Sequence, residues 1–280
     1  MKKHNKHKNY CTAIIAGAGD LPFLLISHLR QSQRIFVVLC LEGNASYELA
    51  KDTNHIFIGL GEIGKALAFL KQNKVKEIVF AGKVKRPSLG SIKLDVKGLS
   101  FLGKLGIEIF KGGDNKILSH IVNLLEDQGF KVIGPENLIP ELVAHLGVLG
   151  KTKPSKQDYK DISVGKEILA ALGASDVGQA VIVEDGYVLG IEAAEGTDNL
   201  ISRCGKLKKE EKRVGVLIKM KKVDQETRID LPGIGTRTLL KIHKAGFKGI
   251  AVESGGSLII NIDAVIKKAN ELKLFLIGID

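Results

Sequence analysis

The first half of the chain alternates between short apolar runs of strand length and longer stretches with helical periodicity. The apolar runs occupy 12–16, 35–41, 55–59, 76–81 and 131–133. Over 22–29, 63–72 and 117–125, apolar residues instead recur every three or four positions, as on one face of a helix. Strands that alternate with helices in this way predict an α/β domain with a parallel, doubly wound sheet, whose ligands lie beyond the carboxyl ends of the strands.

The second half shows a different order of elements. Asp185-Gly186 separates two strand-like runs and predicts a β-hairpin. Further strands are expected at 214–220, 249–253, 258–260 and 274–277, with helices at 162–172, 236–243 and 262–272. These elements predict a smaller mixed α/β domain.

A change of composition separates the two halves. Residues 142–161 include Gly147, Gly150, Pro154 and four lysines, a shift of composition that is typical of a connection between domains. We therefore place the boundary near residue 145, with one domain at 1–145 and a second at 146–280. A chain of 280 residues that is 44% hydrophobic can bury two such cores.

Cysteine content and hydropathy predict a cytoplasmic protein. Cys11, Cys40 and Cys204 are too scattered for a disulfide framework, so free thiols in a reducing compartment are expected. No apolar run is long enough to span a bilayer. The basic segment before Tyr10 is expected to be a frayed tail.

The net charge of +11 favours an anionic partner. That partner could be a phosphorylated metabolite, an anionic membrane face or nucleic acid, and scattered surface lysines are the simpler alternative. Aromatic residues make up only 5% of the chain, without tryptophan, and no basic stretch is interleaved with aromatics. A base-stacking surface needs that pattern, so nucleic acid is the least favoured partner.

A glycine loop follows the first strand. Gly17 and Gly19 match two of the three glycines of a dinucleotide fingerprint, while Pro22 stands at the third position. Backbone N–H groups at a helix N-terminus still favour phosphate, and Asp20 is expected to cap the helix or to bond a sugar or base. After the fourth strand, Lys83 and Arg86 stand at the same predicted edge, where a solvated cationic loop is the alternative.

Asp114 and Asn115 precede an apolar-periodic stretch and are placed to cap a helix, although a contact with substrate stays open. Glu192, Glu195 and Asp198 follow the second hairpin strand. Carboxylates in one short loop could hold Mg²⁺ together with phosphate oxygens, and a solvated acidic strand end is the alternative.

The strongest catalytic candidate is Asp230, which lies in the turn-forming stretch 228–236. Pro232 has a fixed φ, while Gly233 and Gly235 permit positive φ and close approach of the backbone to a ligand. The alternative is a tight turn before the helix that begins near Thr236, with Asp230 merely solvated.

Taken together, five motifs resemble the LpxI-type UDP-2,3-diacylglucosamine pyrophosphatases of lipid A synthesis. The motifs are IAGAGDLP (15–22), AGKVKRP (81–87), GDN (113–115), GIEAAEGTD (190–198) and DLPGIG (230–235). They extend over the whole chain apart from the basic tail.

The resemblance implies Mg²⁺-dependent hydrolysis of UDP-2,3-diacylglucosamine to UMP and 2,3-diacylglucosamine 1-phosphate (lipid X). It also implies a Rossmann-like, nucleotide-binding domain at 1–145, a separate hydrolase and lipid-binding domain at 146–280, and substrate held between them. The family's essential aspartate falls on Asp230. We expect Thr197, Gly233 and Gly235 to contact substrate, and the lipid-linked UDP-sugar implies transient contact with the inner face of the inner membrane. A homodimer is one oligomeric state to test.

Two other classes of protein remain to be weighed. An NAD-binding oxidoreductase or nucleotide sensor would use the glycine loop and an acid at the end of the second strand, where Glu42 stands. That class leaves the acidic motif and the Asp230 loop unexplained. A nucleic-acid-binding module would show steep salt dependence of binding.

Overall fold

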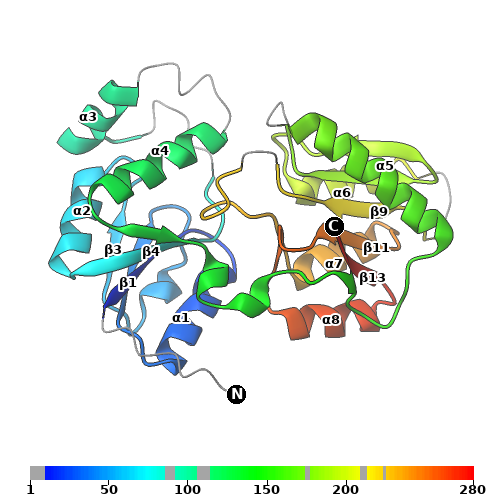
Figure 1. Cartoon of the computed structure of the whole chain (residues 1–280), viewed down its shortest axis with the longest axis horizontal. Coiled ribbons are helices and arrows are strands. Elements are labelled where there is room, and N and C mark those ends of the chain that lie inside the picture. The colour runs from blue at the N-terminus through cyan, green and yellow to red at the C-terminus, as the bar shows by residue number, and fades with distance from the viewer. Residues whose placement is uncertain (1–9, 86–91, 106–113, 174–176, 209–212, 223–224) are drawn as a thin grey trace. The chain divides into compact units, whose positions relative to one another are not determined.

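The computed structural model describes residues 10–85, 92–105, 114–173, 177–208, 213–222 and 225–280. The chain divides into two compact units, Met1–Ile139 and Pro140–Asp280, and each is described by itself (Figure 1). Both units are α/β, which confirms the predicted fold class.

The first unit is built on a five-stranded parallel sheet of order β3-β2-β1-β4-β5. Its strands are β1 (Cys11–Ala16), β2 (Phe36–Leu41), β3 (His55–Ile58), β4 (Val75–Ala81) and β5 (Lys131–Ile133). The sequence order reverses between β1 and β4, which makes their adjacent carboxyl ends the topological switch point of the sheet.

Helices cover this sheet. They are α1 (Leu21–Gln31), α2 (Ile63–Gln72), α3 (Val96–Leu105) and α4 (Asp114–Asp127), with short 3₁₀ turns η1 (Tyr47–Ala50) and η4 (Pro135–Asn137). Pro22 lies in the first turn of α1, as predicted, where its missing N–H costs no hydrogen bond. The apolar stripe of α1 is buried, which identifies the face that packs on the sheet.

Helix α3 was not predicted from the sequence, and Asp95 explains why it forms. The Asp95 carboxylate accepts a hydrogen bond from Gly98 N at 2.7 Å, which caps α3. The same carboxylate accepts from Gly64 N at 2.6 Å, at the start of α2. One acidic side chain therefore satisfies the N-termini of two helices.

The second unit contains a six-stranded mixed sheet of order β6-β13-β11-β9-β7-β8. The strands are β6 (Gly147–Val148), β7 (Ala180–Glu184), β8 (Tyr187–Ile191), β9 (Val216–Lys219), β11 (Gly249–Glu253) and β13 (Phe275–Ile279). Strands β9, β11 and β13 are parallel, whereas β6, β7 and β8 pair antiparallel. Two short strands, β10 (Gly233–Ile234) and β12 (Leu258–Ile259), form a separate parallel sheet.

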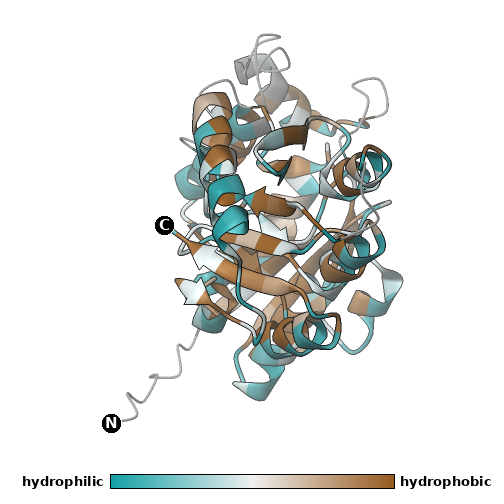
Figure 2. Ribbon diagram, turned by 90° about the vertical axis from the view of Figure 1, so that its right-hand side faces the viewer, coloured by the Kyte–Doolittle hydropathy of each residue, from teal (hydrophilic) through white to brown (hydrophobic). Residues whose placement is uncertain are grey.

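Both faces of this sheet are covered. Helix α5 (Lys156–Gly173) packs on one face, and α6 (Thr197–Gly205), α7 (Thr236–Lys244) and α8 (Ile262–Glu271) contribute to the core on the other. Alternate strand residues point to opposite cores: Ile218 packs with α5, and Leu217 packs with α6 and α7. Figure 2 shows hydrophobic strands of this unit between helices that carry both hydrophobic and hydrophilic residues.

The prediction that 142–161 is a connection between domains is wrong in part, because these residues form secondary structure of the second unit. The 3₁₀ turn η5 (Pro140–Leu142) and strand β6 lie within or beside it, and α5 begins at Lys156 rather than at 162. Ser155 and Asp158 form a capping box, in which Ser155 N donates to Asp158 Oδ2 at 2.7 Å and Asp158 N donates to Ser155 Oγ at 3.3 Å. The S-x-x-D spacing was visible in the sequence.

The hairpin prediction is confirmed. Asp185 and Gly186 adopt φ of 50° and 83°, the positive values that a type I′ turn requires. Their backbone N–H groups donate to the Asp161 carboxylate of α5 at 3.1 and 2.9 Å, which fixes the turn to the helix. None of the helices that the structure describes is long and apolar enough to cross a membrane.

Candidate active site

The strand register of the second unit gathers several predicted motifs at one edge of its sheet. Ala180, at the start of β7, pairs with Lys219 at the end of β9, and Lys219 has Val252 as its partner near the end of β11. Val181 pairs with Ile191, the last residue of β8. The segments that follow β8, β9 and β11 therefore leave the sheet on the same side, which we call the carboxyl edge of the second unit.

A buried polar network lies at this edge. Thr197 Oγ1 donates to Glu192 Oε1 at 2.8 Å and accepts from Lys219 Nζ at 3.0 Å. Gln179 N donates to the other oxygen, Glu192 Oε2, at 3.4 Å. Glu192 and Lys219 are only 6% and 5% exposed, so both charges depend on these bonds. Lys219 is the functional candidate that the sequence reasoning missed, although a lysine inside the apolar run 214–220 was a signal.

Lys219 also reaches the Asp230 loop. Its Nζ donates to Gly233 O at 3.3 Å, while Leu258 N donates to the neighbouring Pro232 O at 2.8 Å. The network thus joins the acidic motif after β8 to the Asp-Leu-Pro-Gly motif, which lies more than thirty positions later in the sequence.

The positive φ predicted for Gly233 and Gly235 is wrong, whereas close approach of the backbone to a ligand at these residues stays a prediction. Neither residue has positive φ, and Gly235 is extended, with φ of −147°. A Cβ at Gly235 would meet no atom within 4 Å, and at Gly233 it would make only ordinary contacts, the nearest at 3.7 Å to Ile260 Cδ1. Gly235 therefore borders open space, so its value to a ligand would be room for close approach rather than backbone conformation.

Asp230 itself is half-buried and is held at both backbone and side chain. Asp230 N donates to Glu226 O at 3.0 Å, within the turn over 227–229. Gln225 Nε2 donates to Asp230 Oδ2 at 2.7 Å. The carboxylate is therefore ordered rather than merely solvated. Nothing in the polar stretch around Gln225 distinguished this residue in the sequence.

The three acids predicted to bind a metal have different partners. Glu192 belongs to the buried network, whereas Glu195 pairs with Arg203 at 2.8 Å and Asp198 pairs with Lys241 at 2.8 Å. The hydrogen bond from Arg203 lowers the pKa of the Glu195 carboxyl. Within the described ranges no three acidic, histidine or cysteine side chains come together in a way that could hold a metal ion.

The motif 190–198 is also not entirely a loop. Gly196 has φ of 77°, and α6 begins directly after it with Thr197 and Asp198. The positive φ, which glycine adopts without strain, turns the chain from the acidic segment into the helix. Thr197 consequently points its hydroxyl into the network from the first position of a helix.

In the first unit, the glycine loop packs against the loop after β4. Ala18 N donates to Lys83 O and Lys83 N donates to Ala18 O, each at 2.8 Å, and Gly17 N donates to Ala81 O at 2.8 Å. A Cβ on Gly17 would lie 2.5 Å from Lys83 O. Gly17 is thus required by the contact between two loops, whereas Gly19, with φ of 103° and no atom within 4 Å of a Cβ, borders open space.

The other predicted nucleotide contacts are dispersed along this unit. Asp20 precedes α1 but makes no side-chain capping bond, so its predicted capping role is wrong. The Lys83 side chain is exposed, and Arg86 lies outside the described residues. Asp114 and Asn115 are the first two residues of α4 rather than residues that precede it.

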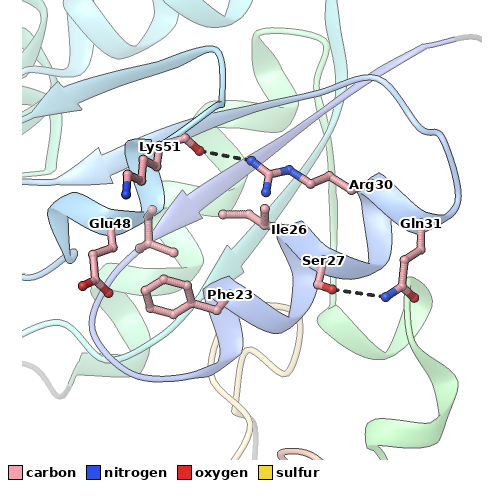
Figure 3. Close-up of a pocket in the computed structure, with 8 residues that line it drawn as sticks. Phe23, Ile26, Ser27, Arg30, Gln31, Glu48 and Lys51 are labelled. Atoms are coloured by element: carbon pink, nitrogen blue, oxygen red, sulfur yellow. Dashed lines mark hydrogen bonds between the residues drawn. The ribbon is translucent and has the colours of Figure 1, made fainter.

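A shallow cavity of about 210 Å³ lies between α1 and η1 of the first unit (Figure 3). Phe23 and Ile26 form its apolar side, and Arg30 crosses it to donate to Lys51 O at 3.1 Å. None of the predicted nucleotide contacts lines it, and its volume is below the range of about 300–1,000 Å³ typical of small-molecule sites. We therefore assign it no ligand.

Comparison with known proteins agrees with this arrangement of motifs. The LpxI N-terminal domain model matches residues 11–142, and the LpxI C-terminal domain model matches residues 145–277. The chain belongs to the LpxI family. It is 36% identical over 272 residues to the UDP-2,3-diacylglucosamine pyrophosphatase LpxI of Caulobacter vibrioides, an alignment that covers 95% of this chain and 96% of that protein. The predicted family is therefore confirmed, and the LpxI match includes both the glycine loop and the carboxyl edge.

Proposed function

We propose that this LpxI-family chain hydrolyses the pyrophosphate bond of UDP-2,3-diacylglucosamine in lipid A biosynthesis. The products are UMP and 2,3-diacylglucosamine 1-phosphate (lipid X). The observation that carries the proposal is the similarity to the Caulobacter pyrophosphatase along nearly the full length of both chains. In the reaction, water adds to one phosphorus, the bridging P–O bond breaks, and the water's proton passes to a base.

Asp230 is the residue proposed to act on this water. Its carboxylate is ordered by Gln225 at 2.7 Å and lies in a loop with open space beside Gly235. Pyrophosphate hydrolysis depends mainly on positioning and on stabilisation of charge, which an oriented carboxylate and nearby cations supply. Lys219 would contribute by fixing the loop, because it is too buried to meet the substrate directly.

Mg²⁺ is also part of the proposal. Glu192, Glu195 and Asp198 do not form a ready-made metal site, because each bonds a different partner. Mg²⁺ is commonly held by only one or two carboxylates, with substrate phosphates and water as its other ligands. We therefore expect the ion to depend on the substrate pyrophosphate for binding and to offset its negative charge.

The first unit is proposed to bind the uridine nucleotide. Gly19 offers open space at the sheet switch point, and the exposed Lys83 side chain stands on the adjoining loop. Gly17 allows the two loops to touch, and Asp20, Asp114 and Asn115 stay predicted contacts.

The two acyl chains of the substrate require apolar shelter. We expect the protein to meet its substrate at the inner membrane face, where its net charge of +11 favours approach.

The test is release of UMP from UDP-2,3-diacylglucosamine by the purified protein, with Mg²⁺ and after exhaustive chelation. We expect UMP and lipid X in equal amounts with Mg²⁺ and almost none after chelation. Asp230→Ala provides the matched negative control. Failure of the wild-type protein to release UMP under these conditions would rule out the proposed activity, and full turnover without a divalent ion would rule out the metal dependence alone.

A further inference from the structure

Gln225 is a buried amide that contacts the candidate catalytic carboxylate directly. It is 8% exposed, and its Nε2 donates to Asp230 Oδ2 at 2.7 Å. Its Oε1 accepts from Lys222 N at 2.8 Å. A backbone N–H can only donate, so this bond fixes which end of the amide is oxygen and directs the NH₂ group to Asp230.

The amide is also tied to the polar network of the carboxyl edge. Gln225 Nε2 lies 3.5 Å from Gln179 Oε1, and Gln179 N bonds Glu192 Oε2. Both hydrogens of the NH₂ group thus have an acceptor. Since the Lys222 backbone and the Gln179 side chain both hold the amide, Gln225 is a fixed support for the Asp230 side chain.

Asp230 differs from neighbouring acids in the kind of partner that it has. Glu195 and Asp198 pair with cationic side chains, and Glu226 accepts from Arg228 Nη2 at 2.7 Å. Asp230 accepts from a neutral amide. Among the described residues, Gln225 is the one side chain that bonds this carboxylate, and it bonds a single oxygen. A neutral donor orients a carboxylate without neutralising its charge, and the second oxygen keeps its capacity to accept a proton or bind a water.

We propose that Gln225 is the positioning residue for Asp230, which it holds in a fixed rotamer with one oxygen committed and the other presented to the reacting water. This inference rests on the proposed function for its kinetic consequence. Loss of the amide would leave Asp230 in place but unoriented. Because the catalysed rate depends steeply on the position of the reacting groups, a misplacement of the carboxylate by about 1 Å can cost about 10²-fold in rate.

The test uses two variants of similar size in the full-length protein. Gln225→Met removes the donor, and Gln225→Glu replaces it with an acceptor. We expect kcat to fall about 10- to 100-fold in Gln225→Met and further in Gln225→Glu, with KM within about threefold of the parent. Gln157→Met is the matched control, because Gln157 Nε2 also donates to an aspartate, Asp161 Oδ1 at 2.9 Å, within α5. Its turnover should stay within about twofold of the parent.

The decisive arm repeats Gln225→Met in an Asp230→Ala background. A residue that acts through Asp230 should cost little further kcat there, whereas an independent role would multiply the two losses. Turnover of Gln225→Met within about twofold of the parent, in a folded protein, would overturn the proposal. So would losses that multiply.

A second cycle needs no substrate and separates this inference from the proposed function. Denaturant unfolding of the parent, both single variants and the double variant measures the coupling between Gln225 and Asp230. We expect about tenfold coupling in the unfolding equilibrium constant, and none between Gln157 and Asp230. If the parent releases no UMP, the proposed function fails, and this cycle alone decides whether Gln225 holds Asp230: absent coupling would overturn the inference.

Discussion

The two sheet edges of this molecule are held together by different kinds of hydrogen bond. At the switch point of the first unit, backbone groups of the loops after β1 and β4 bond one another, and Gly17 is required because those loops touch. At the carboxyl edge of the second unit, the bonds run between side chains, from Glu192 through Thr197 to Lys219. The first edge is therefore a backbone scaffold beside open space, and the second is a preorganised set of charged groups.

This difference teaches where binding and chemistry are to be expected. A backbone scaffold with an exposed lysine suits recognition of a nucleotide phosphate, which needs approach and charge. Ordered carboxylates, in a loop that a buried lysine fixes, suit a reaction in which charge develops at a fixed point. Variants that remove one contact at each edge test this difference.

Lys219→Met should have the largest effect on folding. It removes the donor to Thr197 Oγ1 and Gly233 O and leaves Glu192 buried beside an uncharged neighbour. We expect a loss of about 3 kcal/mol or more in the free energy of unfolding, since buried acceptors and charges are left poorly satisfied. Denaturant unfolding measures the loss, and a change below about 1 kcal/mol would mean that the network is not a supporting element.

Gly17→Ala tests the scaffold of the first unit. The new Cβ would lie 2.5 Å from Lys83 O, so we expect a loss of about 1–3 kcal/mol as the two loops move apart. Gly103→Ala is the matched control, because Gly103 lies in α3 with no atom within 4 Å of a Cβ. In a helix that change should be neutral or should stabilise by up to about 1 kcal/mol. Equal melting temperatures for the two variants would contradict the loop-contact account.

The smallest expected effect concerns Glu226, whose pKa is lowered by the hydrogen bond from Arg228 despite partial burial. Because the folded-state pKa lies below the unfolded one, the stabilisation is present above the ordinary pKa of 4.5 and is lost as pH falls through the folded value. The melting temperature of Glu226→Gln should therefore lie below that of the parent at about pH 7 and approach it as the pH falls below 4.5 and through the lowered folded-state pKa. A difference that does not change with pH would contradict this origin.

Most of the architecture could be predicted from sequence, because strand and helix periodicities are local. The extent of α5 was missed because its capping box lies in a glycine- and lysine-rich stretch, and α6 was missed because its N-terminus looked like an acidic loop. Asp230 could be singled out as a candidate from its turn-forming neighbours. Gln225 could not, because its role depends on contacts with Lys222 and Gln179 that only the folded edge creates.

The division of labour between the two edges is tested most directly by steady-state UMP release from Asp230→Ala and Lys83→Ala in the same assay. Asp230→Ala should lower kcat by about 10²- to 10⁴-fold, as expected for loss of a general base, with KM changed by only a few-fold. Lys83→Ala should raise KM with kcat nearly unchanged, because it would remove a binding contact made equally in the ground state and transition state. Turnover by Asp230→Ala within a few-fold of the parent, or a fall in kcat confined to Lys83→Ala, would contradict the account.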